Sequence, residues 1–226
     1  MSTQTQAELF DQILSERYSC RAYLDKAVPK DVIEKIFATA QKTASWSNMQ
    51  PWEVTIVSGD ALRKFGAALQ GDVAGNEASP DFPFPTSYDG VYQDRRRACG
   101  LQLYKSVGIG REDKAQAKAQ MMANFDGFGA PHMAIITSVA DFGTYGAIDC
   151  GGYVSSVLGV ARSHGVASIA QAAIARNSGF VKDHLGIDPG RNVVCGISFG
   201  YEDPDHVANK FRTPRAALDD VITWVE

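Results

Sequence analysis

Cysteine and histidine are scarce in this 226-residue sequence, and neither is spaced as a metal site or a redox pair. No cysteine forms a Cys-x-x-Cys pair, and none has a histidine at ligand spacing. The four cysteines are Cys20, Cys99, Cys150 and Cys195. This pattern argues against a zinc site, a redox dithiol and a disulfide-stabilised scaffold, so we expect no metal. The four histidines also lack the spacing of a catalytic triad, which favours structural roles.

Long apolar runs and a strong charge of either sign are also missing. No apolar run reaches the roughly 18 residues of a membrane span, and residues 1–8 lack a signal-peptide pattern. Lysine and arginine total 22 against 26 aspartates and glutamates, a formal net charge of −4. Because a general nucleic-acid binder needs a basic surface, we expect no nucleic-acid partner. We expect a cytoplasmic protein that does not enter a membrane.

Glycine motifs for nucleotide phosphates are incomplete. No Gly-x-x-x-x-Gly-Lys loop is present, and the glycine pair Gly108 and Gly110 lacks a third glycine. This pair also follows a predicted helix, whereas a dinucleotide-binding loop follows a strand. A nicotinamide dehydrogenase built on a dinucleotide-binding fold is therefore disfavoured.

Hydrophobic periodicity predicts more helices than strands. Helical patterns cover residues 7–15, 31–40, 61–69, 92–107, 112–124, 145–164 and 180–185, and strand patterns cover residues 54–57, 132–139 and 193–199. Residues 71–89 are irregular and contain three prolines, which is typical of a binding loop or lid. We predict a single three-layer α+β domain over residues 1–226, with a central mixed sheet flanked by helices and a lid or insert at about 71–130.

A short basic motif, Arg17-Tyr18-Ser19-Cys20-Arg21, follows the first helical pattern. In an extended chain, side chains at i, i+2 and i+4 leave on the same face, so Arg17, Ser19 and Arg21 would converge. Two guanidinium groups and a hydroxyl suit a phosphate, because arginine forms paired, charge-assisted hydrogen bonds with phosphate oxygens. Tyr18 and Cys20 would point away and pack. Arginines on a solvated surface are the alternative.

Two further segments support the phosphate interpretation. The loop Ser45-Trp46-Ser47-Asn48-Met49-Gln50-Pro51-Trp52 gathers amides and hydroxyls before a strand, and Arg212 and Arg215 lie near the C-terminus. In this order, the three segments resemble the nitroreductase family of FMN-dependent oxidoreductases. The likeness extends from about residue 8 to about residue 224. It implies the nitroreductase-like three-layer fold and a homodimer.

The resemblance also implies roles for the three segments. Arg17, Ser19 and Arg21 would bind the FMN phosphate, joined by Arg212 and Arg215, although these two arginines could instead stabilise a surface turn. The polar edge of the flavin would contact the loop that provides Ser45, Trp46, Ser47, Asn48 and Gln50, with Ser45 and Asn48 reaching across a dimer interface. Trp46 stands where a smaller residue is more usual. A turn in which Asn and Ser bond the local backbone is the alternative for this loop.

The reaction itself would need no catalytic side chain, because flavin N5 is the reactive centre. The segment containing Ala170, Gln171 and Ala172 resembles the family segment whose backbone N–H faces N5. Phe125 and Phe128 would line the substrate pocket, although aromatic residues at helical spacing are more often core.

The resemblance implies an FMN-dependent NAD(P)H oxidoreductase that reduces nitroaromatic compounds or quinones. NADPH or NADH would bind first and reduce the flavin, and a small aromatic acceptor would then take its place. Reductive dehalogenation, flavin fragmentation and non-catalytic flavin binding remain alternatives, because a shared fold does not fix the chemistry.

Overall fold

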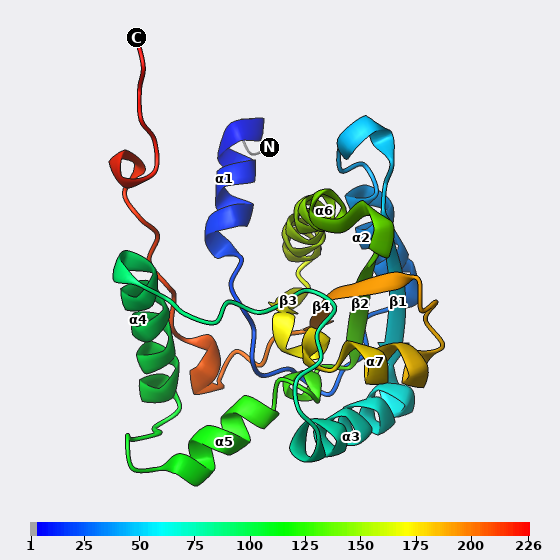
Figure 1. Cartoon of the computed structure of the whole chain (residues 1–226). Helices are drawn as coiled ribbons and strands as arrows, with labels where there is room; N and C mark the ends of the chain where they lie inside the picture. The colour runs from blue at the N-terminus through cyan, green and yellow to red at the C-terminus, as the bar shows by residue number, and fades with distance from the viewer. Residues whose placement is uncertain (1–3) are drawn as a thin grey trace.

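A four-stranded antiparallel sheet forms the centre of the structure, a computed structural model that describes residues 4–226 (Figure 1). In sheet order the strands are β1 (Trp52–Ser58), β2 (His132–Val139), β4 (Arg191–Gly200) and β3 (Ala167–Gln171). Every neighbouring pair is antiparallel, so the prediction of a mixed sheet is wrong. Within residues 4–226, parallel pairing occurs only at isolated bridges, including that of Ser19 with Ser168. Apolar patterns identify buried strands but not their directions, which depend on how the connections return the chain.

Two helices cover each face of the sheet. One pair is α2 (Lys30–Ala40) and α6 (Gly143–Ser163), and the other is α3 (Gly59–Gly75) and α7 (Ser178–Leu185). Along β2, Ala134 and Ile136 join the core beneath α2 and α6, whereas Met133 and Ile135 join the core beneath α3 and α7. Alternate side chains leave a strand on opposite faces, so a strand covered on both sides is apolar throughout. The predicted three-layer α+β architecture is confirmed.

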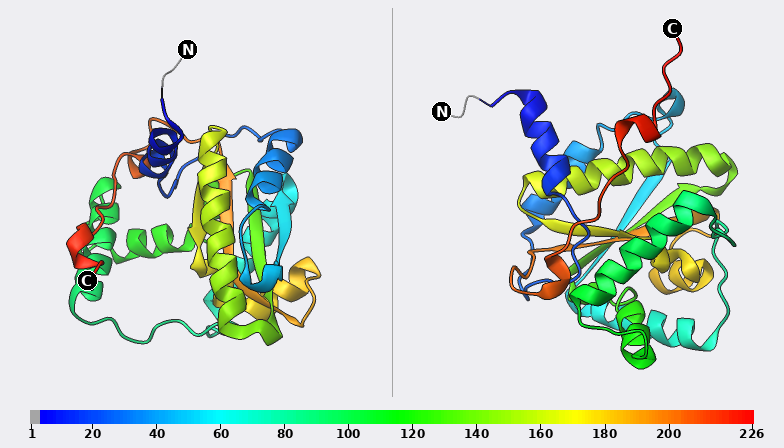
Figure 2. Two further views of the ribbon diagram at one scale, coloured as in Figure 1. Left: turned by 90° about the horizontal axis from the view of Figure 1, so that it is seen from above. Right: turned by 90° about the vertical axis from the view of Figure 1, so that its left-hand side faces the viewer.

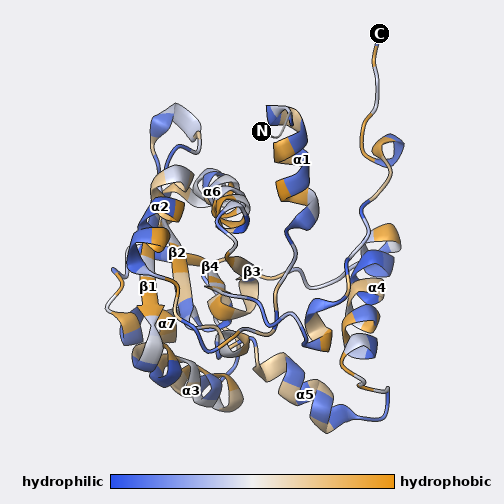
Figure 3. Ribbon diagram, turned by 180° about the vertical axis from the view of Figure 1, so that it is seen from behind, coloured by the Kyte–Doolittle hydropathy of each residue, from blue (hydrophilic) through white to orange (hydrophobic). Residues whose placement is uncertain are grey.

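Three helices lie outside these layers: α1 (Gln6–Glu16), α4 (Gly90–Ser106) and α5 (Lys114–Met122). None of the three contains a buried residue. Figure 2 shows α4 and α5 on the side of the molecule that also carries α1 and the C-terminal segment. Apolar and polar residues are interspersed on α1 and α4 (Figure 3), so both helices leave apolar side chains exposed.

The predicted helices and strands are present with shifted ends, and one strand was missed. The helix predicted over residues 61–69 continues to Gly75, because Val73 is also buried. The missed strand is β3, whose small and polar residues have little intrinsic preference for a strand. Pairing with β4 holds it in place, and its Ser168 carbonyl accepts a hydrogen bond of 3.2 Å from the Cys20 N–H.

Across residues 4–226, no helix combines the length and the apolar character that crossing a bilayer requires.

A buried histidine connects β2 to the segment before α2. The Val28 N–H donates to His132 Nε2 at 3.0 Å, so Nδ1 carries the ring proton and faces Ser58 Oγ at 2.7 Å. Burial lowers the pKa of His132, because charging the ring would cost solvation and break the bond to Val28.

Stability should therefore fall as the pH drops below about 6.5, the ordinary pKa of an unfolded histidine. In this range the unfolded chain takes up the His132 proton more readily than the folded chain. We expect the urea midpoint to decrease between pH 7.5 and pH 5.5, and to decrease less in His132→Gln. An equal pH dependence in the two proteins would contradict this role.

Candidate functional site

Four arginines from opposite ends of the chain line one cavity of about 400 Å³. The extended segment after α1 supplies Arg17, Ser19 and Arg21, and the C-terminal segment supplies Arg212 and Arg215. We call this group of five residues the arginine cradle. Its lining contains no carboxylate among the residues that the structure describes. The cavity therefore has a strong positive potential and suits a phosphate or another multiply charged anion.

The predicted alternation of residues 17–21 brings together three of the five cradle residues. The bridge between Ser19 and Ser168 holds this segment extended beside β3, and Cys20 is fully buried. Arg17, Ser19 and Arg21 therefore share the opposite face, which is the face of the cavity. Burial lowers the pKa of both arginines, and for Arg17 the nearby charge of Arg215 lowers it further. A bound anion would relieve both effects.

Tyr18 was predicted to pack away from the site, but it also lines the cavity. The guanidinium of Arg212 lies 3.7 Å from the centre of the Tyr18 ring, and the Tyr18 hydroxyl donates to the Glu202 carboxylate. Burial and this hydrogen bond raise the pKa of Tyr18, which stays protonated. The ring thus steadies Arg212 through a cation–π contact, a role that the local pattern did not indicate.

The loop over residues 45–50 lies elsewhere. None of its residues lines the cradle cavity, and α6 lies between α1 and this loop (Figure 1). The Trp46 N–H donates to the Asp149 carboxylate on α6 at 3.2 Å, and the Gln50 N–H donates to Ser45 Oγ at 2.9 Å. Ser47, Asn48 and Gln50 have positive φ angles of 48°, 56° and 48°.

Left-handed backbone at three non-glycine residues is costly, so surrounding contacts must hold this loop in one conformation. Trp46 is 57% exposed, and its ring lies 4.8 Å from that of Tyr145. The structure therefore does not bring Ser45–Gln50 and the cradle together within one chain.

Ala170 and Gln171 end β3, the edge strand of the sheet, and Ala172 begins the short 3-10 helix that follows it. β3 pairs with β4 on one side only, and the outward Ser168 carbonyl accepts from Cys20. Because peptide groups alternate in direction along a strand, the Ala170 N–H points to this same edge. Ala170 and Ala172 are exposed.

The side chain of Gln171 faces the core instead. It is 3% exposed, its Nε2 donates to the Asn124 carbonyl at 2.7 Å, and its Oε1 accepts from Ser198 Oγ at 2.5 Å. The Gln171 side chain is therefore not available to a ligand at this edge.

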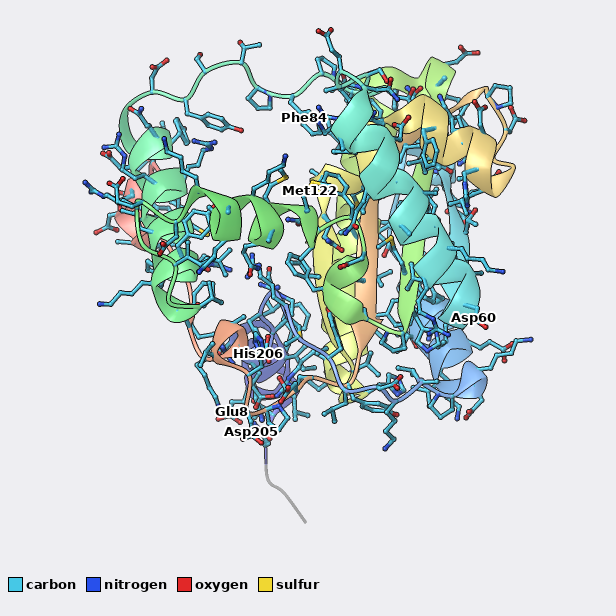
Figure 4. All side chains as sticks on the ribbon, turned by 90° about the horizontal axis from the view of Figure 1, so that it is seen from below. Glu8, Asp60, Phe84, Met122, Asp205 and His206 are labelled. Atoms are coloured by element: carbon cyan, nitrogen blue, oxygen red, sulfur yellow. The ribbon has the colours of Figure 1, made fainter. Side chains whose placement is uncertain are left out.

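The two phenylalanines predicted to line a substrate pocket are buried. Phe125 is 1% exposed and belongs to the core beneath α3 and α7, so its prediction as a pocket residue is wrong. Its helix-like spacing reflected packing onto that core. Phe128 is 9% exposed and lies 6.0 Å from the Arg21 guanidinium, so it borders the cradle. Figure 4 labels two other apolar residues, Phe84 in the segment that precedes α4 and Met122 at the end of α5, and Phe84 is 39% exposed.

Comparisons with known proteins identify the family of the chain. Residues 14–201 match the nitroreductase family. The chain is 32% identical over 215 residues to nitroreductase NfnB of Mycolicibacterium smegmatis, covering 95% of this chain and 92% of that protein. It is 31% identical over 208 residues to a 4-nitrobenzoate reductase of Pseudomonas putida, covering 91% of both.

A solved structure extends the likeness to three dimensions. The FMN-dependent nitroreductase NfnB from Mycobacterium smegmatis, in complex with NADPH, superposes with a TM-score of 0.94 at 30% identity. The match covers 98% of this chain and 100% of that one. The family match, the two relatives and the superposed structure each cover most of the sequence. The chain therefore belongs to the nitroreductase family.

Proposed function

We propose that this protein is an FMN-dependent NAD(P)H oxidoreductase that reduces nitroaromatic compounds. The arginine cradle is the observation that carries the proposal. A phosphate monoester has a charge of about −1.5 to −2 near neutral pH, and the cradle offers four guanidinium groups with no competing carboxylate in the described lining. The relatives are a nitroreductase and a 4-nitrobenzoate reductase, and the aligned solved structure is FMN-dependent.

The residues of the chain fit FMN from its phosphate to its ring. Arg17, Ser19 and Arg21 would hold the phosphate from one side, and Arg212 and Arg215 from the other. The Ser19–Ser168 bridge joins this segment to β3, so the Ala170 N–H lies a short distance along the same edge and would donate to the ring. Bound FMN supplies the two-electron chemistry that connects the nicotinamide donor to the nitro group. The protein would bind and orient the cofactor and its two substrates and keep water out of the site.

A homodimer would complete the site. The loop over residues 45–50 lies away from the cradle of its own chain, so it would contact the flavin held by the partner. Apolar side chains that such an assembly would cover are exposed on α1, α6 and the C-terminal segment. Leu9, Phe10 and Leu14 are 46%, 63% and 49% exposed, and Trp224 and Val225 are 75% and 93% exposed. An exposed apolar surface of this kind marks a protein interface.

The segment between α3 and β2 would act as a lid over the aromatic acceptor. α4 and α5 contain no buried residue, and α4 contacts the C-terminal segment through Gln102 Nε2, which donates to the Arg212 carbonyl at 3.0 Å. Few core contacts make such a segment easier to displace than the sheet. We also place the enzyme in the cytoplasm, because all four cysteines are free thiols, as a reducing compartment favours.

Absorbance spectroscopy tests the proposal. The purified protein should bind FMN with a visible flavin spectrum, and NADPH or NADH should bleach that spectrum under argon. Adding 4-nitrobenzoate should restore the oxidised spectrum and sustain NAD(P)H consumption. Bleaching without reoxidation by any nitroaromatic compound would instead favour dehalogenation or flavin fragmentation. A flavin that neither donor bleaches would indicate a non-catalytic flavin-binding protein.

A further inference from the structure

Asn209 is a buried asparagine that joins the N-terminal and C-terminal parts of the chain. It is 4% exposed and lies in the short turn Val207–Asn209 that follows β4. Its Oδ1 accepts from the Arg21 N–H at 2.9 Å. Its Nδ2 donates to the carbonyls of Ala22 and Asp203, both at 2.9 Å. Every N–H of the side chain is thus used, and its oxygen is bonded.

The same residue contacts both halves of the arginine cradle. Its side chain fixes the backbone of Arg21, and its own carbonyl accepts from Arg212 Nη1 at 2.8 Å. Arg21 and Asn209 are 188 positions apart in the sequence, so this junction is where the N-terminal and C-terminal arms of the cradle meet. A displacement of Asn209 would therefore move Arg21 and Arg212 relative to each other.

Only a primary amide fits this junction. The Arg21 N–H requires an acceptor, while the carbonyls of Ala22 and Asp203 require donors. A carboxylate would place an oxygen against two carbonyls. An aliphatic side chain would remove the partner of the Arg21 N–H and of the Asp203 carbonyl, while the Ala22 carbonyl would still accept from the Asp203 N–H at 3.0 Å. The demand for one acceptor and two donors also fixes which way the amide points.

We propose that Asn209 is a positioning residue that sets the spacing between Arg21 and Arg212 for a phosphate group. This inference rests on the proposed FMN site. Binding of a phosphate by paired guanidinium groups depends on their geometry as well as their charge. Asn209 lies outside the cavity lining and acts through the two arginines.

Comparing FMN with riboflavin separates positioning from general stability, because riboflavin has the same ring and ribityl chain without the phosphate. Dissociation constants for both are measured on apoprotein by quenching of flavin fluorescence. In Asn209→Ala we expect FMN affinity to fall about tenfold, the equivalent of one well-placed hydrogen bond to a charged group, with riboflavin affinity unchanged within about twofold. Asn209→Ser, which retains a hydroxyl, provides the same measurement if the alanine variant does not fold.

Asn177→Ala is the matched control. Asn177 is 2% exposed, its Nδ2 donates to Asp72 Oδ2 at 2.6 Å, and its Oδ1 accepts from Arg176 Nη1 at 2.7 Å. We expect this variant to lose stability but to keep the wild-type ratio of FMN to riboflavin affinity.

The outcomes distinguish the two proposals. Equal losses for FMN and riboflavin in the Asn209 variants, or no loss at all, would overturn the positioning role. Wild-type protein that binds FMN no better than riboflavin would instead overturn the phosphate site itself.

Discussion

Arg21→Ala is expected to weaken FMN binding roughly 100-fold, the largest effect on cofactor retention that the structure predicts. Arg21 is the cradle arginine that lies between two aromatic rings, 6.0 Å from the centre of Phe128 and 5.7 Å from that of Phe211. Its Nη1 donates to the Ser19 carbonyl at 3.2 Å, which aims the guanidinium along the wall of the cavity. No carboxylate in the described lining neutralises it, so its charge remains available to a phosphate.

Equilibrium dialysis with absorbance of the retained flavin measures this effect, and Arg96→Ala is the control. Arg96 lies on α4 with its guanidinium 4.8 Å from the centre of the Tyr88 ring, and it does not line the cradle cavity. We expect Arg96→Ala to retain FMN as the wild type does. If Arg21→Ala kept its full complement of flavin through dialysis, the phosphate assignment would be wrong.

Arg191→Met is expected to lower the free energy of unfolding by about 3 kcal/mol, the largest loss of stability among these predictions. Arg191 is 8% exposed and lies at the start of β4, beside an irregularity in the β2–β4 register between Ile136 and Thr137. Its Nη2 donates to the carbonyls of Pro51 and Thr137 at 2.7 and 3.1 Å, and its Nε donates to Thr137 Oγ1 at 2.8 Å.

Methionine would fill the same space without these donors, leaving buried acceptors unsatisfied at the end of the 45–50 loop. Urea unfolding of the apoprotein, at one fixed protein concentration, measures the loss. We expect the dependence of the unfolding free energy on urea concentration to keep its wild-type slope. Arg63→Met is the control, because the ion pair of Arg63 with Asp60 has both side chains more than two-thirds exposed, at 71% and 80%. We expect it to change stability by less than about 0.5 kcal/mol. A loss of similar size in both variants would contradict the special role of Arg191.

Local patterns predicted those parts of the site that lie within one short segment. The spacing of Arg17, Ser19 and Arg21 placed them on one face, because strand alternation depends only on adjacent residues. The same reasoning placed Cys20 in the core, where it is fully buried. It failed for Tyr18, because Arg212 and Glu202, which hold its ring and hydroxyl, come from the distant C-terminal part of the chain.

Packing between distant segments decided the rest. Phe125 resembled a pocket residue in its sequence context, yet the layer of α3 and α7 buries it. The loop over residues 45–50 was expected at a flavin, but α6 separates it from the cradle of its own chain (Figure 1). The junction at Asn209 left no signal in the sequence, because its partners Arg21 and Ala22 are more than 180 positions away.

By itself, the sequence determined the three apolar layers, most of the helices and the cationic face of residues 17–21. Hydrophobic periodicity and charge depend only on the residues of one short segment, so they can be read from the sequence without knowing how that segment packs. Only the tertiary structure decided the antiparallel order of the sheet and the meeting of the two ends of the chain around one cavity. Strand direction and long-range contacts arise from how separate segments pack together, which no single segment encodes.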